Sequence, residues 1–462
     1  MSLLINAISA VGNNSGVYPL LVRDCGIEVP TKVVQTYNQN KKESTLMAKH
    51  ATRERVLDEY STTAVWVGGV PAVEYLFNKF LKKKGLNGKI SYKLLENDEK
   101  KAKNGTKTQQ SLDINIEKFK NSAPKEVEEL KKLKANKGLF KKFTVAKYAA
   151  ALAVPISLMG FVIPKANFLL TSYLMDKDAQ KGLLPEKYLR KKSISQGELN
   201  AESGKNLNVV STEQDAEINY NRLYNSSKNT KFTSLNSIKQ GNSPAFTGFS
   251  SFMTGLSHQQ KMAATDGGYA VGRVATSRKK NEAIENGFKM AAMMYLNFVA
   301  PKRIEKGLDF LTGKMFGINP ELDPKIMANK RFLALARSDK LELPKNEEEV
   351  LEFLDTKPKS LFSKIAANQG DVTYLENGVR DPRVYVDTEK VFKLSQKMDK
   401  FANDARLSGD VSKYAKKALK AKSANIIANI AISSTLLAVA LPQAQFALRK
   451  ALFKSDVDPG LV

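Results

Sequence analysis

Few side chains in this 462-residue chain have the chemistry of a nucleophile or a general base. Cys25 is the one cysteine, and His50 and His258 are the two histidines. His50 lies among lysine and arginine residues, which predicts a solvated position on a charged helix, and no nucleophile-elbow pattern surrounds His258. A lone cysteine is most often a small buried apolar side chain. The sequence therefore predicts no catalytic residue and no enzyme; an enzyme that uses Cys25 or a histidine is the less favoured hypothesis.

Metal and phosphate chemistry have equally little support. One cysteine is too few for a zinc site made of four cysteines, or of two cysteines and two histidines. Acidic clusters such as residues 347–349 lie in lysine-rich sequence and are typical of a solvated surface. Residues 266–273 read Asp-Gly-Gly-Tyr-Ala-Val-Gly-Arg, which resembles a phosphate loop but lacks its spacing and a preceding strand. We expect no cofactor and no metal.

The charge of the chain points to a polyanionic partner. Lysine and arginine number 73 against 47 acidic residues, which gives a formal net charge of +26. Such a field attracts nucleic acid or an anionic membrane surface. The basic residues are mostly lysine, whereas base-specific recognition favours arginine, so the membrane is the better candidate. The single cysteine indicates a reducing compartment, and the uncharged first 22 residues lack the basic start of a secretory signal.

The longest apolar segment lies near the C-terminus. Lys422 and Arg449 bracket 26 residues without a charge, and about 20 apolar residues are enough to cross a bilayer as a helix. A second segment has only 17 uncharged residues, between Lys147 and Lys165, which is marginal for a span. The mean hydropathy of −0.34 excludes a transporter made mainly of lipid-facing helices but permits one or two inserted segments.

Four prolines follow apolar runs and precede amphipathic ones, at Pro71, Pro164, Pro301 and Pro442. Proline cannot donate a backbone hydrogen bond, so each site is predicted to be a kink or the start of a second helix. Whether the repeated pattern is a duplication or a consequence of composition stays open. The predicted membrane contacts are Trp66, Pro71, Phe161, Pro164, Phe168, Phe298, Pro301, Leu437, Val439, Pro442 and Phe446.

Lysine-rich collars flank the apolar segments and are predicted to contact anionic lipid. If the segments before Pro164 and Pro442 both crossed, we expect residues 141–147 and 449–450 on one face, with residues 165–181 and 413–422 on the other. Both faces would then be basic, which favours segments that enter one leaflet and return at the proline. The predicted lipid-contacting residues are Lys141, Lys142, Lys147, Lys416, Lys417, Lys420, Lys422, Arg449 and Lys450.

The predicted fold is mostly α-helical, with long Lys/Asn-rich loops and one small β-hairpin at the Asn-Gly pair of residues 377–378. Its predicted regions are a loop-rich N-terminal arm (1–44), a helical region with two proline-broken apolar segments (45–175), a polar linker (176–243), a Phe/Gly-rich loop with the third apolar segment (244–317) and a helical C-terminal region (318–462).

The leading functional hypothesis is a non-enzymatic protein with a structural or scaffold role at the cytoplasmic face of a membrane. Its expected partners are anionic lipids, together with further copies of itself through the apolar helices. The alternative is a soluble helical scaffold or a non-specific nucleic-acid-binding protein in the cytoplasm. In that case the apolar segments are core helices.

Overall fold

The fold is that of a helical protein. The computed structural model describes residues 3–13, 17–41, 44–104, 109–183, 258–275, 277, 280–318 and 320–454. Among these residues the regular elements are α-helices and π-helical turns, with no strand, which confirms the predicted mostly α-helical fold. The predicted polar linker from residue 184 onward and the Phe/Gly-rich loop up to residue 257 lie outside the described residues.

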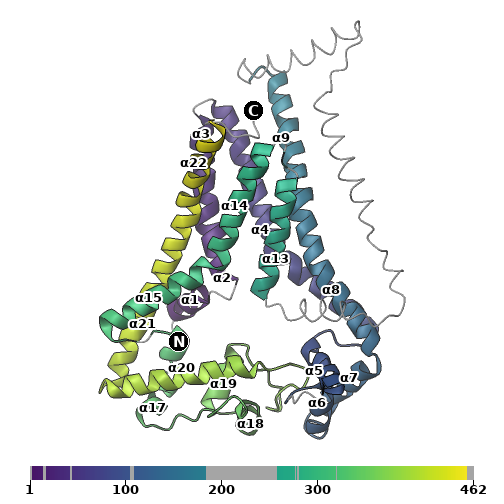
Figure 1. The fold of residues 1–462 in the computed structure, drawn as a ribbon, viewed down its shortest axis with the longest axis vertical. Coiled ribbons are helices and arrows are strands. Elements are labelled where there is room, and N and C mark those ends of the chain that lie inside the picture. The colour runs from purple at the N-terminus through teal and green to yellow at the C-terminus, as the bar shows by residue number, and fades with distance from the viewer. Residues whose placement is uncertain are drawn as a thin grey trace.

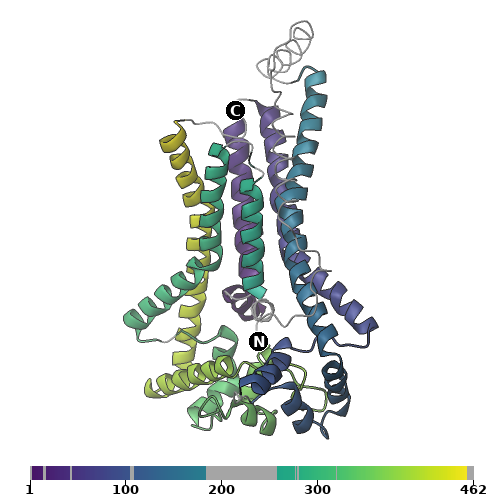
Figure 2. The same ribbon diagram turned by 45° about the vertical axis from the view of Figure 1, so that its right-hand side comes forward.

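Long helices stand side by side in the upper part of the molecule (Figures 1 and 2). We call these helices the bundle. Two stretches of it, Lys137–Met175 and Val411–Phe453, are continuous helices of 39 and 43 residues. Each passes through a short π-helical turn. The bundle consists of α2 (Tyr18–Leu21), η1 (Val22–Glu28), α3 (Val29–Lys41), α4 (Thr45–Lys83), α8 (Lys137–Ser157), η2 (Leu158–Val162), α9 (Ile163–Gln180), α13 (His258–Ala275), α14 (Lys280–Phe298), α21 (Val411–Thr435), η5 (Leu436–Ala440) and α22 (Leu441–Phe453).

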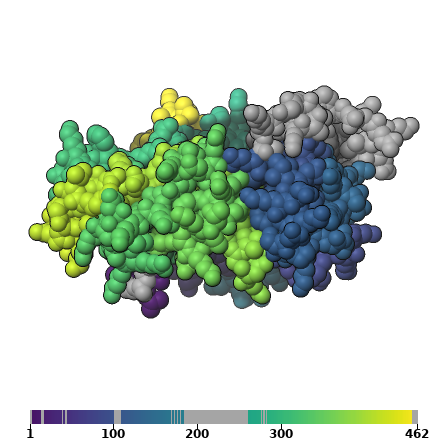
Figure 3. Space-filling model, turned by 90° about the horizontal axis from the view of Figure 1, so that it is seen from below, coloured from purple at the N-terminus to yellow at the C-terminus, as the bar shows by residue number. Residues whose placement is uncertain are grey.

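Shorter helices form a layer across one end of the bundle, which we call the platform. The platform helices are α5 (Tyr92–Asn104), α6 (Leu112–Lys118), α7 (Pro124–Ala135), α16 (Pro324–Met327), α17 (Lys330–Arg337), α18 (Val350–Thr356), α19 (Leu361–Asn368) and α20 (Thr388–Leu407). The platform has two parts, one made of α5–α7 and one made of α16–α20. Seen from below, the two parts lie next to each other (Figure 3). Two further helices, α1 (Leu3–Gly12) and α15 (Ala300–Phe316), lie between bundle and platform (Figure 1).

The platform is held together by ordinary apolar cores. Phe332, Phe362 and Phe401 are fully buried in the larger cluster, and leucines of α5–α7 form much of the smaller one. The segment before α20 joins the two parts, because the amide of Gln110 exchanges hydrogen bonds of 2.7 and 2.9 Å with the backbone of Val386. The predicted hairpin is only a tight turn there, with an isolated antiparallel bridge between Tyr374 and Arg380.

The prolines interrupt fewer helices than expected. Pro71 lies inside α4, and Pro164 and Pro442 lie inside long helices at the second position after a π-helical turn. A π-helical turn before the proline lets the helix continue without the backbone hydrogen bond that proline cannot donate. The prediction of a helix start is right for Pro301 alone among the four, since α15 begins there.

The predicted loop-rich N-terminal arm is wrong. Residues 3–12 and 18–41 are helical, and the second stretch joins the bundle. Pro19 is tolerated in the first turn of α2, where its missing N–H has no partner to lose. Pro30 follows η1 in the same arrangement as Pro164 follows η2. The prolines and glycines in the described part of residues 1–44 therefore lie in helical segments and not in loops.

The platform cores predict that the same substitution at two leucines has different effects on the free energy of unfolding. Leu354→Ala removes a side chain with no exposed area, so it should lower the free energy of unfolding of the platform by about 3 kcal/mol. Leu407→Ala is the matched control, because Leu407 is 87% exposed and its loss should cost under about 0.5 kcal/mol. Hydrogen exchange of α18–α20 measures both. Equal protection in the two variants would contradict the assignment of this core.

Candidate membrane interface

The outward face of α4 is free of charge over a length that matches a bilayer. Between Lys49 and Lys79 the charged side chains of α4 are half-buried, and its exposed side chains are uncharged. The distance from the first to the last of them is roughly 28 Å at 1.5 Å per residue, against about 30 Å of hydrocarbon in a bilayer. They are Leu57, Tyr60, Ala64, Gly68, Pro71, Ala72, Tyr75 and Leu76.

Two further helices are long and apolar enough to cross a membrane. They cover Lys137–Met175 and Val411–Phe453, and only 28% and 39% of their most apolar windows are buried. On the second helix no exposed side chain between Lys420 and Lys450 is charged. A core helix of a soluble protein buries its apolar window. In these two helices most of the window is exposed or half-buried.

The platform lacks such an apolar surface. Within the described parts of residues 84–136 and 317–418, Leu407 is the one large apolar side chain that is exposed. By contrast, α14 alone exposes Ile284, Phe288 and Tyr295. Soluble proteins rarely expose contiguous apolar surface of this extent. Exposed large apolar side chains therefore gather on the bundle and on α1 and α15, and not on the described platform.

Many charged side chains of the bundle turn toward other helices, where they pair, although Lys165 of α9 is exposed. On α13, Arg273 forms an ion pair with Asp58 of α4, and its Nε donates a 3.0 Å hydrogen bond to the Tyr269 hydroxyl. Lys32 pairs with Glu28, and its ammonium lies 3.7 Å from the Glu59 carboxylate of α4. Pairing offsets the cost of removing charges from water. It also allows the outer faces of the same helices to be apolar.

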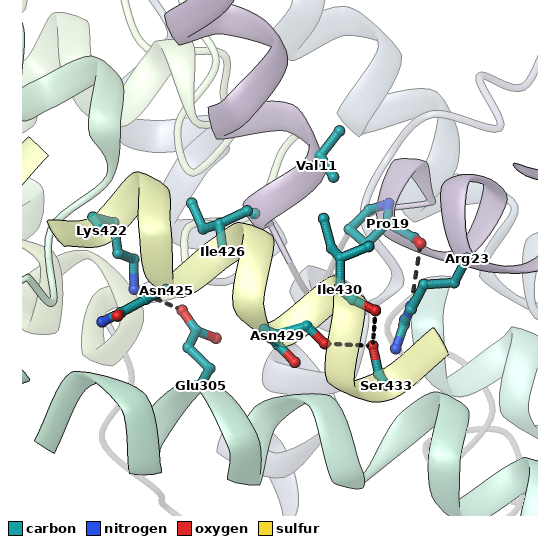
Figure 4. Close-up of a pocket in the computed structure, with 11 residues that line it drawn as sticks. Val11, Pro19, Arg23, Glu305, Lys422, Asn425, Ile426, Asn429, Ile430 and Ser433 are labelled. Atoms are coloured by element: carbon teal, nitrogen blue, oxygen red, sulfur yellow. Dashed lines mark hydrogen bonds and ion pairs between the residues drawn. The ribbon is translucent and has the colours of Figure 1, made fainter. Parts of the chain in front are cut away.

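Ion pairs also tie α21 and α22 to their neighbours. The Lys422 ammonium donates 2.8 Å hydrogen bonds to Glu305 and to Asp309 of α15. Further along, Arg449 forms a bidentate ion pair with Glu285 of α14. Figure 4 shows α21 between Glu305 of α15 on one side and Val11, Pro19 and Arg23 of the N-terminal helices on the other. Polar residues of α21 recur on one helical face as Lys422, Asn425, Asn429 and Ser433.

Glycines bring three bundle helices into close contact. A Cβ at Gly272 of α13 would lie 3.0 Å from the Gly160 Cα of η2, and one at Gly268 would meet Ile156. A Cβ at Gly69 of α4 would lie 2.9 Å from the Pro155 ring. Gly268 and Gly272 form a G-x-x-x-G pattern, which packs helices closely in membranes. The segment that resembles a phosphate loop is therefore a helix whose glycines serve packing.

The structure separates the predicted membrane contacts into two groups. Pro71, Phe161, Val439 and Phe446 are exposed on the bundle, so contact with lipid stays a prediction for them. Pro164 and Pro442 are half-buried, and the Phe168 side chain lies outside the described residues.

Four predicted contacts are corrected because their side chains pack inside the protein. Leu437 has no exposed area, and Pro301 is also buried. Trp66 is 5% exposed, and its ring packs edge-on against half-buried Phe298 with centroids 6.4 Å apart. Apolarity predicts burial as well as lipid contact, so sequence alone did not distinguish these positions.

The predicted lipid-contacting residues divide in the same way. Lys422 and Arg449 are corrected, because they form the internal ion pairs described above. Lys147 is also buried, with its ammonium 5.0 Å from the centre of the Tyr148 ring, and Lys141 pairs with Glu99. The exposed members are Lys142, Lys416, Lys417, Lys420 and Lys450.

The predicted arrangement of the two basic collars is wrong. Helices α8–α9 and α21–α22 run in the same direction, both away from the platform (Figure 1). Lys142 and Lys416–Lys420 therefore lie at the platform end, and Lys177 and Lys450 lie at the far end. Each helix continues through its proline, which contradicts segments that enter one leaflet and return. The relative direction of two segments depends on the helices between them, which the local pattern did not reveal.

Cys25 and His50 are not brought together, and the side chain of His258 lies outside the described residues. His50 is 5% exposed and not solvated as expected; its Nε2 lies 2.7 Å from Asp178. The Tyr60 hydroxyl donates a 3.5 Å hydrogen bond to the Cys25 carbonyl, and Tyr60 lies roughly 15 Å along α4 from His50. In the described part of the chain, no group of three or more His, Cys, Asp or Glu side chains could hold a metal ion.

Comparison with known proteins gives no further guide to this arrangement. No protein-family model, curated protein or solved structure matches the chain.

The internal ion pairs predict different roles for two adjacent basic residues. Arg449→Gln leaves Glu285, which is 3% exposed, without its charged partner, and should destabilise the bundle by roughly 3 kcal/mol. Lys450→Gln is the control, since Lys450 is exposed. Thermal unfolding of the detergent-solubilised protein, followed by size-exclusion chromatography, measures both. Adding Glu285→Gln to Arg449→Gln should recover much of the loss; if it deepens the loss, pairing is not the cause.

The close helix contact predicts opposite effects of one substitution at two helical glycines. Gly307→Ala has no atom within 4 Å of the new methyl group and should stabilise α15 by about 0.5–1 kcal/mol. Gly272→Ala places its methyl group 3.0 Å from the Gly160 backbone, which cannot move aside alone, and should be destabilising by about 1 kcal/mol. The same thermal assay compares them. A stabilising Gly272→Ala would contradict the packing of α13 on η2.

Proposed function

We propose that this chain is a non-enzymatic integral membrane protein in which the bundle spans the bilayer and holds the platform at one membrane face. The observation that carries the proposal is the outward apolar and inward charged arrangement of the bundle helices. A soluble bundle would place these side chains the other way round. The role that fits is structural, as an anchored scaffold.

The proposal accounts for α4, which hydropathy alone does not identify as a membrane-spanning helix. Helix α4 carries six charged residues from Arg53 to Glu74, yet these are half-buried and its exposed residues between Lys49 and Lys79 are uncharged. Lys261 of α13 reaches Glu74 across the interior, with a 2.7 Å hydrogen bond. Ionisable residues inside a membrane face the protein interior and pair with one another. Asp58, Glu59 and Glu74 of α4 follow that rule, through Arg273, Lys32 and Lys261.

The distribution of exposed lysines supports a cytoplasmic platform. At the platform end exposed basic residues flank α4, α8, α15 and α21, whereas the far end carries fewer. Cytoplasmic flanks of membrane helices are enriched in lysine and arginine, and anionic lipids attract them. Among the described residues, those at the platform end include Lys82, Lys83, Lys142, Lys302, Arg303, Lys306, Lys413, Lys416, Lys417 and Lys420, and those at the far end are Lys41, Lys49, Lys177, Lys181, Lys280, Lys450 and Lys454.

Membrane fractionation tests the proposal. The expressed protein should remain in the membrane pellet after washing with high salt and with alkaline carbonate, and should need detergent for extraction. Phe161→Asp with Val439→Asp places two charges on the exposed apolar face, at a cost of about 3 kcal/mol each near the bilayer centre. This variant should be lost from the pellet.

Two surface residues of the platform provide the control. Lys359→Asp with Gln396→Asp adds the same two carboxylates to exposed platform positions and should leave membrane retention unchanged. Release of the unaltered protein by salt alone would mean that it is attached only by charge. A soluble protein whose binding to DNA falls steeply with salt would favour the nucleic-acid alternative instead.

A further inference from the structure

A wide groove opens between α15, the end of α20 and the beginning of α21. Its volume is about 1290 Å³, which is large enough for a lipid headgroup together with part of its acyl chains. It lies where the bundle meets the platform, at the depth of the lipid headgroups if the bundle spans a bilayer (Figure 1).

The charge of the groove favours an anion. Seven lysines and five carboxylates line it, and several of the carboxylates already have partners. Glu305 and Asp309 bind the Lys422 ammonium, and Glu321 lies 3.8 Å from Lys400. The Asp410 carboxylate caps α21, where the backbone N–H of Lys413 lowers its pKa. The local charge of the groove is therefore positive.

Five of the lining lysines are not neutralised by a carboxylate. Among the described residues, none of them has an ion-pair partner. They come from both walls of the groove, from α15 on one side and from α20 and α21 on the other. These lysines are Lys306, Lys314, Lys397, Lys413 and Lys417.

Apolar side chains line the same groove. Phe310 and Phe316 of α15 are 69% and 65% exposed, and Leu407 at the end of α20 is 87% exposed. Leu407 is also the one large exposed apolar residue of the described platform. A free phosphate or a phosphosugar has no apolar part that could pack against these side chains, whereas the acyl chains of a lipid could. Basic and apolar walls together therefore distinguish a lipid from a soluble anion.

We infer that this groove binds the phosphate headgroup of an anionic phospholipid, with the first part of its acyl chains against Phe310 and Phe316. The inference rests on the proposed function, because it needs the groove at the membrane surface. It adds a specific lipid site to the general attraction of the basic surface for the membrane. Bound lipid would link α15 of the bundle side to α20 of the platform.

Titration of short-chain lipids into the purified full-length protein in a neutral detergent tests the inference. Dioctanoyl phosphatidylglycerol should bind at least ten-fold more tightly than dioctanoyl phosphatidylcholine, as read by native mass spectrometry. The variant Lys397→Gln, Lys413→Gln and Lys417→Gln should weaken binding of phosphatidylglycerol by about five-fold for each lysine removed. The control variant, Lys125→Gln, Lys131→Gln and Lys359→Gln, changes three exposed lysines elsewhere and should bind as the unaltered protein does.

Each other outcome overturns the inference. Equal binding of the two lipids would remove the anionic selectivity, and unchanged binding by the first variant would place the lipid elsewhere. Displacement of phosphatidylglycerol by an equal concentration of inorganic phosphate would make this a site for free phosphate. Both variants should stay in the carbonate-washed pellet, so a failure of the lipid site is distinguishable from a failure of the membrane-spanning proposal, in which the unaltered protein is released.

Discussion

The bundle can present apolar side chains to its surroundings because its charged side chains are paired with one another inside it. Arg273 with Asp58, Arg449 with Glu285 and Lys422 with its two carboxylates each join different helices. A buried ion pair adds little net stability over a well-packed apolar pair, but loss of one partner is costly. The pairs therefore fix which helices meet and which face of each helix is left outside. The uncharged outward faces of the bundle helices are consistent with these inward pairs.

Helix content and the two most apolar segments could be predicted from sequence, since both depend on local composition. The role of α4 could not, because its charges lower the average hydropathy although they face inward. Burial of His50 and Leu437 was missed for the same reason, since sidedness depends on neighbours far away in the chain. One signal was available. The exposed residues of α4 from Leu57 to Leu76 recur at helical spacing without a charge, which a search by helical face would have found.

The role of proline in the long helices differs from the predicted kink or helix start. Three π-helical turns are each followed by an apolar residue and a proline, at Val29-Pro30, Ile163-Pro164 and Leu441-Pro442. The rearranged turn absorbs the missing hydrogen bond, so the helix continues in nearly the same direction. Continuous helices keep both of the most apolar segments running away from the platform. As a result the basic residues that precede both segments lie at the platform end, where the groove is, and those that follow both segments lie at the far end.

The most direct test of the account is the depth of the outward face of α4, which hydropathy does not identify as membrane-spanning. In a Cys25→Ser background, spin labels at exposed Ala64 of α4, Ala153 of α8 and Ala431 of α21 would be compared with one at Gln396 of the platform, after reconstitution in vesicles. The account predicts that the three bundle labels collide readily with oxygen and poorly with a water-soluble nickel complex, and that the label at 396 does the reverse. Nickel accessibility at position 64 equal to that at position 396 would contradict the embedded bundle.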